Sequence, residues 1–203
     1  MNNRAFNNFY ILEPFGIKNE NPAEAIYGYE NSIDVKLWRG NTQLLVGKVV
    51  STDNSKWCGS ITNHNYSVGD LVVYNPTCVI KTFSDETLLV RDDAIICLFD
   101  KDTNAPAANE NEVVVKVYLT TSPDMDNIVN GFPGVVMDIQ LGEYWDEETH
   151  LDEVKVGDDV IVVNPYQTGT EAAHDVFRKV STTTGFYIIS EVDAIACKVE
   201  SEK

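Results

Sequence analysis

The chain has 203 residues, a formal net charge of −17 and a pI near 4.4. The acidic excess disfavours nucleic acid and anionic membrane surfaces as partners, because affinity for both comes mainly from Lys and Arg. No apolar run approaches the roughly 20 residues of a membrane span, and the first residues lack the apolar core of a signal peptide. These features predict a cytoplasmic protein, either cellular or virus-encoded and acting in a host cytoplasm.

The expected elements are short strands rich in Val, Ile, Leu, Tyr and Phe, bounded by Gly, Pro, Asn and Asp. In the first half they span residues 9–12, 44–50, 70–74, 87–90 and 94–99. In the second half they span residues 113–119, 134–139, 159–163, 185–189 and 194–199. Pro14 is expected to end the first strand, and a single helical turn is expected at 91–93 or 191–193. This pattern predicts an all-β fold, a barrel or a sandwich.

The two halves repeat one another. The matched blocks, in chain order, are residues 47–50 with 134–136, 68–70 with 156–158, 75–76 with 164–165, and 93–97 with 193–197. In the same order, the blocks read Gly-x-Val or Gly-Val-Val, Val-Gly-Asp, Asn-Pro and Asp-Ala-Ile-x-Cys. Matched blocks in the same order indicate two tandem copies of one small β domain.

The spacing of the copies locates the framework and the variable loops. The offset between copies is 87 at the glycines, 88 at Val-Gly-Asp, 89 at Asn-Pro and then 100 at Asp-Ala-Ile. We expect a longer hairpin or loop at 166–185, because loops absorb length changes better than strands. The predicted domains are residues 1–100 and 112–203, joined by a linker at 101–111 that is rich in Asn, Asp, Ala and Pro.

The Val-Gly-Asp blocks predict a tight turn before a strand. Glycine adopts a positive φ there without strain, and the aspartate side chain can accept hydrogen bonds from backbone N–H groups of the turn. Cys97 and Cys197 occupy matched positions in apolar strands, so we expect both to be small buried core residues without a disulfide bond. Free thiols agree with a reducing compartment.

Together these blocks resemble the GroES family, the small co-chaperonins that cap chaperonin rings. The second copy carries the closest motifs, at residues 153–162 (Glu-Val-Lys-Val-Gly-Asp-Asp-Val-Ile-Val) and 187–196 (Tyr-Ile-Ile-Ser-Glu-Val-Asp-Ala-Ile-Ala). The first copy keeps a looser version at 47–50, 68–70 and 90–95. The resemblance implies two tandem GroES-like β-barrels. Such a protein would associate with copies of itself into a ring or dome and cap a chaperonin ring to assist ATP-dependent protein folding.

In the GroES family a loop after the first strand orders as it docks a hydrophobic tripeptide on the chaperonin, and this coupling keeps binding reversible. The corresponding loops here would span about residues 14–44 and about residues 121–133. The candidate anchors in these loops are Ile26, Tyr27, Ile33, Val35, Ile128 and Val129. The same segments can instead be edge strands or interface segments of a barrel that does not bind a chaperonin.

A second family feature is a roof hairpin, often charged, that faces the ring axis. By analogy the acidic cluster Asp146, Glu147 and Glu148 would lie there, although a solvated loop has the same composition.

No motif in the sequence indicates an enzyme. The chain lacks phosphate-binding Gly-x-x-x-x-Gly-Lys and Gly-x-Gly-x-x-Gly patterns, and His64, His150 and His174 have no metal-ligand spacing. We therefore expect no catalytic residues, no metal and no cofactor. The alternative function is a structural assembly component built on the same barrels, for example in a virus or bacteriophage particle, since one fold hosts unrelated functions.

Overall fold

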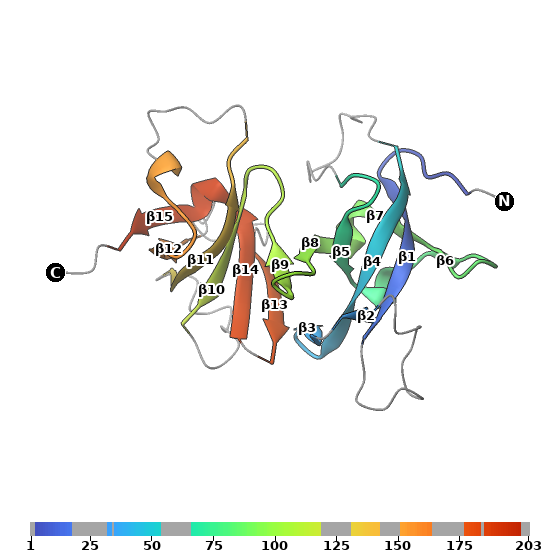
Figure 1. Cartoon of the computed structure of the whole chain (residues 1–203), viewed down its shortest axis with the longest axis horizontal. Coiled ribbons are helices and arrows are strands. Elements are labelled where there is room, and N and C mark those ends of the chain that lie inside the picture. The colour runs from blue at the N-terminus through green and yellow to red at the C-terminus, as the bar shows by residue number, and fades with distance from the viewer. Residues whose placement is uncertain are drawn as a thin grey trace, which may run out of the picture. The chain divides into compact units, whose positions relative to one another are not determined.

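The structure, a computed structural model, describes residues 3–17, 32–33, 35–53, 66–118, 131–142, 151–163, 177–183 and 185–199. The chain divides into two compact units, Met1–Pro106 and Ala107–Lys203, and both are built of strands (Figure 1). Regular structure in the described residues is β-strand with single turns of 3₁₀ helix, so the all-β class is confirmed. Within the same ranges, no helix has the length and apolar character needed to cross a membrane.

In the described residues the first unit contains eight whole strands and most of a ninth, β9, which ends one residue beyond it. These are β1 (Phe9–Ile17), β2 (Ser32–Ile33), β3 (Leu37–Arg39), β4 (Thr42–Thr52), β5 (Leu71–Tyr74), β6 (Lys81–Thr82), β7 (Leu88–Arg91), β8 (Ile95–Asp100) and β9 (Ala105–Ala107). They pair in the order β6-β7-β1-β4-β5-β8-β9, with β2 also on β1 and β3 also on β4. Two 3₁₀ turns, η3 (Pro76–Cys78) and η4 (Asp92–Ala94), connect them.

The second unit contains six strands in the described residues. These are β10 (Glu112–Val117), β11 (Phe132–Gln140), β12 (Asp159–Val162), β13 (Arg178–Thr182), β14 (Gly185–Glu191) and β15 (Ile195–Lys198). They pair in the order β13-β14-β10-β11-β12-β15. Its 3₁₀ turns are η7 (Leu151–Glu153) and η8 (Val192–Ala194).

The strand order of the second unit reproduces that of the first. The order β13-β14-β10-β11-β12-β15 matches β6-β7-β1-β4-β5-β8 position by position. The registers also agree. Leu12 pairs with Val49 in the first unit, and Val115 pairs with Val136 in the second. Each of these ladders carries a β-bulge at the same place, which leaves Val50 and Met137 unpaired. The repeat read from the sequence is therefore a repeat of topology and register.

Gly47 in β4 and Gly134 in β11 occupy matched positions. Each lies where the paired strand, β1 or β10, approaches closely. A Cβ on Gly134 would lie 2.5 Å from the carbonyl oxygen of Lys116 in β10. A Cβ on Gly47 would lie 3.1 Å from Leu12 Cβ and 3.3 Å from Tyr74 Cε1. A side chain at position 134 would separate the paired strands, and one at position 47 would crowd the neighbouring side chains, so glycine suits both places.

Each unit has its own hydrophobic core. In the first, Tyr10 and Tyr66 pack edge to face at 5.7 Å between ring centroids, among Leu12, Val49 and Val72. In the second, Phe132 and Phe177 pack edge to face at 5.8 Å. Burial of these side chains stabilises each sheet. An aromatic side chain removes about 150–250 Å² of surface from water, and each Å² of buried apolar surface contributes about 25 cal/mol.

Several expectations need correction. β1 does not stop at Pro14 but continues to Ile17. The strand tolerates this proline because the β7 ladder ends at Leu12, so Pro14 lies beyond the doubly paired part of β1. The sequence also did not predict β2, β3, β6, β9 and β13. A single helical turn was expected at 91–93 or at 191–193, and the structure has a 3₁₀ turn at both places, η4 and η8.

The described ladders do not close either sheet into a barrel. In the first unit no ladder among the described residues joins β6 to β8 or β9, and in the second none joins β13 to β15. The segment expected as a linker, residues 101–111, is also more ordered than a plain connection, because Ala105–Ala107 forms β9 on the edge of β8.

Candidate functional site

The Val-Gly-Asp turns have the predicted geometry in both units. Gly69 and Gly157 have φ of +105° and +93°, where glycine is unstrained. The Asp70 carboxylate accepts a hydrogen bond from Ser67 N at 2.7 Å, and the Asp158 carboxylate accepts one from Lys155 N at 2.8 Å. These bonds fix the entry to β5 and β12.

Each turn is tied to the bulge of the preceding long strand. Gly69 N donates to the carbonyl of Val49 at 2.8 Å, and Gly157 N donates to the carbonyl of Val136 at 2.8 Å. The valine before each glycine, Val68 or Val156, is more than 60% exposed. Matched exposed valines at a rigid turn indicate a surface feature common to both units.

The first loop leaves from β1 and is partly structured at both margins. Ser32–Ile33 forms β2, which pairs in parallel with the end of β1 through Ile17 and Ile33. Val35 is only 9% exposed, so its side chain offers little surface to a partner in this conformation. Ile26 and Tyr27 lie outside the described residues.

The second loop leaves from β10 and returns before β11. Ile128 and Val129 lie outside the described residues. At the margins, the Tyr118 hydroxyl donates a hydrogen bond to the Asp159 carboxylate, which raises the pKa of Tyr118. Gly131 has φ of +73°, and a Cβ there would lie 2.8 Å from side-chain atoms of Ile161 and Val163. The return into β11 therefore depends on glycine.

The expected roof cluster, Asp146, Glu147 and Glu148, also lies outside the described residues. The residues on either side of it are described. Gly142 N donates to Asn111 Oδ1 at 2.8 Å on one side, and η7 begins at Leu151 on the other.

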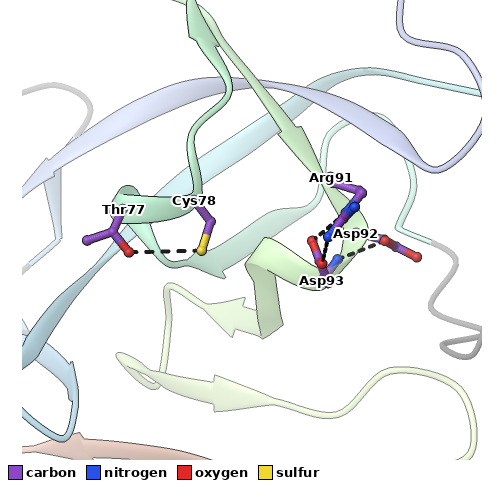
Figure 2. A network of polar contacts seen from close by, with 5 residues as sticks. All are labelled: Thr77, Cys78, Arg91, Asp92 and Asp93. Carbon is purple, nitrogen blue, oxygen red and sulfur yellow. Dashed lines mark hydrogen bonds and ion pairs between the residues drawn. The ribbon is translucent and has the colours of Figure 1, made fainter.

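The 3₁₀ corners before β8 and β15 differ in charge. In η4, Arg91 forms an ion pair with Asp93, and Asp93 N donates to the Asp92 carboxylate (Figure 2). The hydrogen bond from Arg91 lowers the pKa of Asp93. Glu191 replaces Arg91 in the second unit, and burial raises the pKa of Asp193 instead.

The matched last strands differ in burial, and this corrects the expectation for the cysteines. Cys97 in β8 is fully buried as expected, whereas Cys197 in β15 is exposed. β8 has β5 on one side and β9 on the other, while β15 has only β12 among the described residues.

The described residues contain no group of three or more His, Cys, Asp or Glu side chains placed to hold a metal ion. Two ionic features that sequence reasoning missed are the pair between Glu112 and Arg178 and the 2.7 Å pair between Asp158 and Lys198. Both join residues far apart in the sequence, so no local spacing marked them.

No protein-family model matches the chain, and a search of the curated proteins finds no match. The functional assignment therefore depends on the motifs and on the geometry of the repeated units.

Proposed function

We propose that the chain is a tandem co-chaperonin of the GroES type, whose two units are GroES-like β-barrels. Copies of the chain associate into a ring or dome, and this assembly caps a chaperonin ring to assist ATP-dependent folding of a client protein. The chain has no catalytic role in this scheme, since ATP hydrolysis belongs to the chaperonin.

The observation that carries the proposal is the common register of the two units. In each unit one loop interrupts the chain between the first long strand and the second, from β1 toward β4 and from β10 to β11. Between the bulge and the Val-Gly-Asp turn, residues 54–65 and 143–150 lie outside the described part of the chain. A rigid sheet that presents loops at fixed places is the arrangement expected of a binding scaffold.

The anchors belong to the first of these loops. Ile26 and Tyr27 in the first unit, and Ile128 and Val129 in the second, supply the apolar side chains for a groove on the chaperonin. Ordering of a segment on binding lowers the net affinity, which allows the cap to leave in each cycle.

A refolding assay tests this function. A chaperonin ring with ATP and a chaperonin-dependent client is expected to give a higher yield of active client when the chain is present. The double variant Ile26→Ser/Tyr27→Ser and the matched variant Ile128→Ser/Val129→Ser in the second unit identify which loop acts. If both double variants stimulate refolding as well as the unchanged chain does, the loops are not the anchors.

A second candidate is a structural assembly component, for example of a virus or bacteriophage particle. Two observations favour it: Val35 is buried, and β2 pairs with β1, so part of the first loop serves the sheet. Full refolding activity in the assay above excludes this role as the main one.

A further inference from the structure

We propose that the β3–β4 hairpin, residues 36–44, docks on the acidic second unit of a neighbouring copy of this chain. Lys36 and Arg39 supply the charged contacts and Trp38 supplies the apolar one. The inference deepens the self-association half of the proposed function, and it rests on that function only in requiring copies to associate. It does not require a chaperonin.

Negative charge is divided unevenly between the two units. Residues 1–106 contain nine Lys and Arg against thirteen Asp and Glu, which gives a net charge of −4. Residues 107–203 contain six Lys and Arg against nineteen Asp and Glu, which gives −13. Repulsion therefore disfavours contact between the second units of two copies, whereas a basic place on the first unit is complementary to the second.

The β3–β4 hairpin is such a basic place. β3 runs antiparallel to β4, with Arg39 opposite Thr42. Gly40 has a φ of +56° in the turn that joins the two strands, where glycine is unstrained. Lys36 directly precedes β3 and Arg39 ends it, and both side chains are exposed. Two cations thus flank one short strand.

The register of the hairpin decides which face meets a partner. Leu37 and its partner Leu44 are 0% and 1% exposed, so the face that carries them is buried. Side chains alternate between the two faces of a strand, so Trp38 and its partner Gln43 lie on the opposite face. There Trp38 is half-buried and Gln43 is exposed. A tryptophan with exposed surface is a large apolar contact of the kind that dominates protein interfaces.

Neither cation of the hairpin is used within the described part of the chain. No described carboxylate forms an ion pair with Lys36 or Arg39, and neither lies over a described aromatic ring. Other cations have internal partners, such as a carboxylate for Arg91, Arg178 and Lys198 or an aromatic ring for Lys81. The charges of Lys36 and Arg39 are therefore available to a partner molecule.

The basic character of this segment belongs to the first unit alone. At the offset of 87 between the matched glycines, Lys36 and Arg39 correspond to Pro123 and Asp126 in the second unit. The contact is therefore head to tail, from the first unit of one copy to the second unit of the next. Such a contact generates a ring if the rotation closes and a filament if it does not.

The three side chains suit a surface rich in carboxylates. The planar guanidinium of Arg39 can donate two parallel hydrogen bonds to one carboxylate, and the ammonium of Lys36 binds a second as a point charge. The indole N–H of Trp38 can donate to a further oxygen. Because exposed charges are screened beyond about 10 Å at about 0.1 M salt, we expect the contact to weaken as salt is added.

The first test is sedimentation velocity of the full chain across a concentration series, at low and at high salt. Lys36→Glu/Arg39→Glu reverses the two charges of the hairpin. The matched control is Lys81→Glu/Lys101→Glu, which reverses two other exposed cations of the first unit and changes the net charge equally. Circular dichroism confirms that each variant is folded.

We expect the unchanged chain to associate, and its association to weaken at high salt. Lys36→Glu/Arg39→Glu should associate at least about tenfold more weakly than the control at low salt, because attraction to the second unit is replaced by repulsion. Equal association of the two variants, or an unchanged chain that stays monomeric throughout, would overturn the proposal.

Cross-linking of the unchanged chain gives an independent readout that needs no variant. Natural-abundance and ¹⁵N-labelled chains are mixed as monomers, concentrated and treated with a carbodiimide, which joins a lysine amine to a carboxylate in contact with it. Peptides that combine both isotopes come from two different copies. We expect such peptides to join Lys36 to an Asp or Glu of residues 107–203.

Mixed-isotope peptides that omit Lys36, or that join it only to residues 1–106, would contradict the proposal. Because no chaperonin is present in either experiment, failure of this contact is distinct from failure of the capping function. A chain that caps a chaperonin but shows no contact at Lys36 would keep the proposed function and lose this interface.

Discussion

Arg178 and Glu112 form an ion pair from two strands, β13 and β10, that flank β14 on opposite sides. The Glu112 side chain is 2% exposed and that of Arg178 is 15% exposed. Glu112 also accepts a hydrogen bond from Asn109 N at 3.0 Å. The first unit has Phe9 and Lys81 at the corresponding positions, so this buried pair belongs to the second unit alone.

Removal of the cation is predicted to destabilise the second unit. Arg178→Ala leaves a buried carboxylate without this ion pair and should lower the free energy of unfolding by about 3 kcal/mol. Chemical denaturation followed by circular dichroism measures the change. The control is Arg91→Ala, which breaks the solvent-exposed pair with Asp93 and should leave the denaturation midpoint nearly unchanged. An equal effect of the two variants would show that burial does not determine the strength of these pairs.

The two matched glycines predict a graded response to alanine. Gly134→Ala places a methyl group 2.5 Å from a backbone oxygen, which must move the strand. Gly47→Ala meets side-chain atoms at 3.1 and 3.3 Å, which can shift by a few tenths of an ångström. We expect the free energy of unfolding to fall by about 3 kcal/mol for Gly134→Ala and by about 1 kcal/mol for Gly47→Ala. Thermal unfolding of the two variants tests the order, and a larger loss at Gly47 would contradict the register described for β10 and β11.

The Asp158–Lys198 pair predicts a pH-dependent stability. The hydrogen bond from Lys198 lowers the pKa of Asp158 below its ordinary 3.8. A carboxylate whose pKa is lowered by folding stabilises the folded state above its ordinary pKa, and this contribution is lost as the pH falls through the folded value. Asp158→Asn should therefore unfold at a lower temperature than the unchanged chain at pH 7. This difference in thermal midpoint should disappear as the pH approaches 2.

Asp158→Asn keeps an oxygen that can accept the hydrogen bond from Lys155 N, so the variant isolates the charge. Thermal midpoints measured from pH 7 to pH 2 give the comparison. A difference that grows as the pH falls would mean that the carboxylate does not stabilise the folded state through its charge.

Hydrogen exchange distinguishes the two proposed functions. If the chain caps a chaperonin, addition of the ring and nucleotide should slow exchange within residues 18–31 and leave the β4 amides unchanged. No change in exchange within residues 18–31 when the ring and nucleotide are added is the result expected of a structural assembly component.

The sequence predicted the parts of the fold that depend on local chemistry. The Val-Gly-Asp turns were foreseen because a positive φ and an aspartate side chain define them within four residues. The long strands were foreseen because their apolar residues recur in both copies. One helical turn was foreseen, at 91–93 or at 191–193, and both η4 and η8 are present.

The parts that were missed depend on partners distant in the sequence. Cys197 has the same local sequence context as Cys97, yet it is exposed, and within the described ranges β15 pairs with β12 alone whereas β8 also pairs with β9. The polar composition of residues 101–111 concealed β9, whose pairing depends on the position of β8. The extension of β1 through Pro14 likewise depends on where the β7 ladder ends.

The central claim, that this chain caps a chaperonin, is tested most directly by gel filtration of the purified chain with a chaperonin ring, with ATP, with ADP and without nucleotide. We predict that the chain co-elutes with the ring only when nucleotide is present and that Ile26→Ser/Tyr27→Ser abolishes or weakens this co-elution. A chain that elutes separately from the ring under all three conditions would contradict the account.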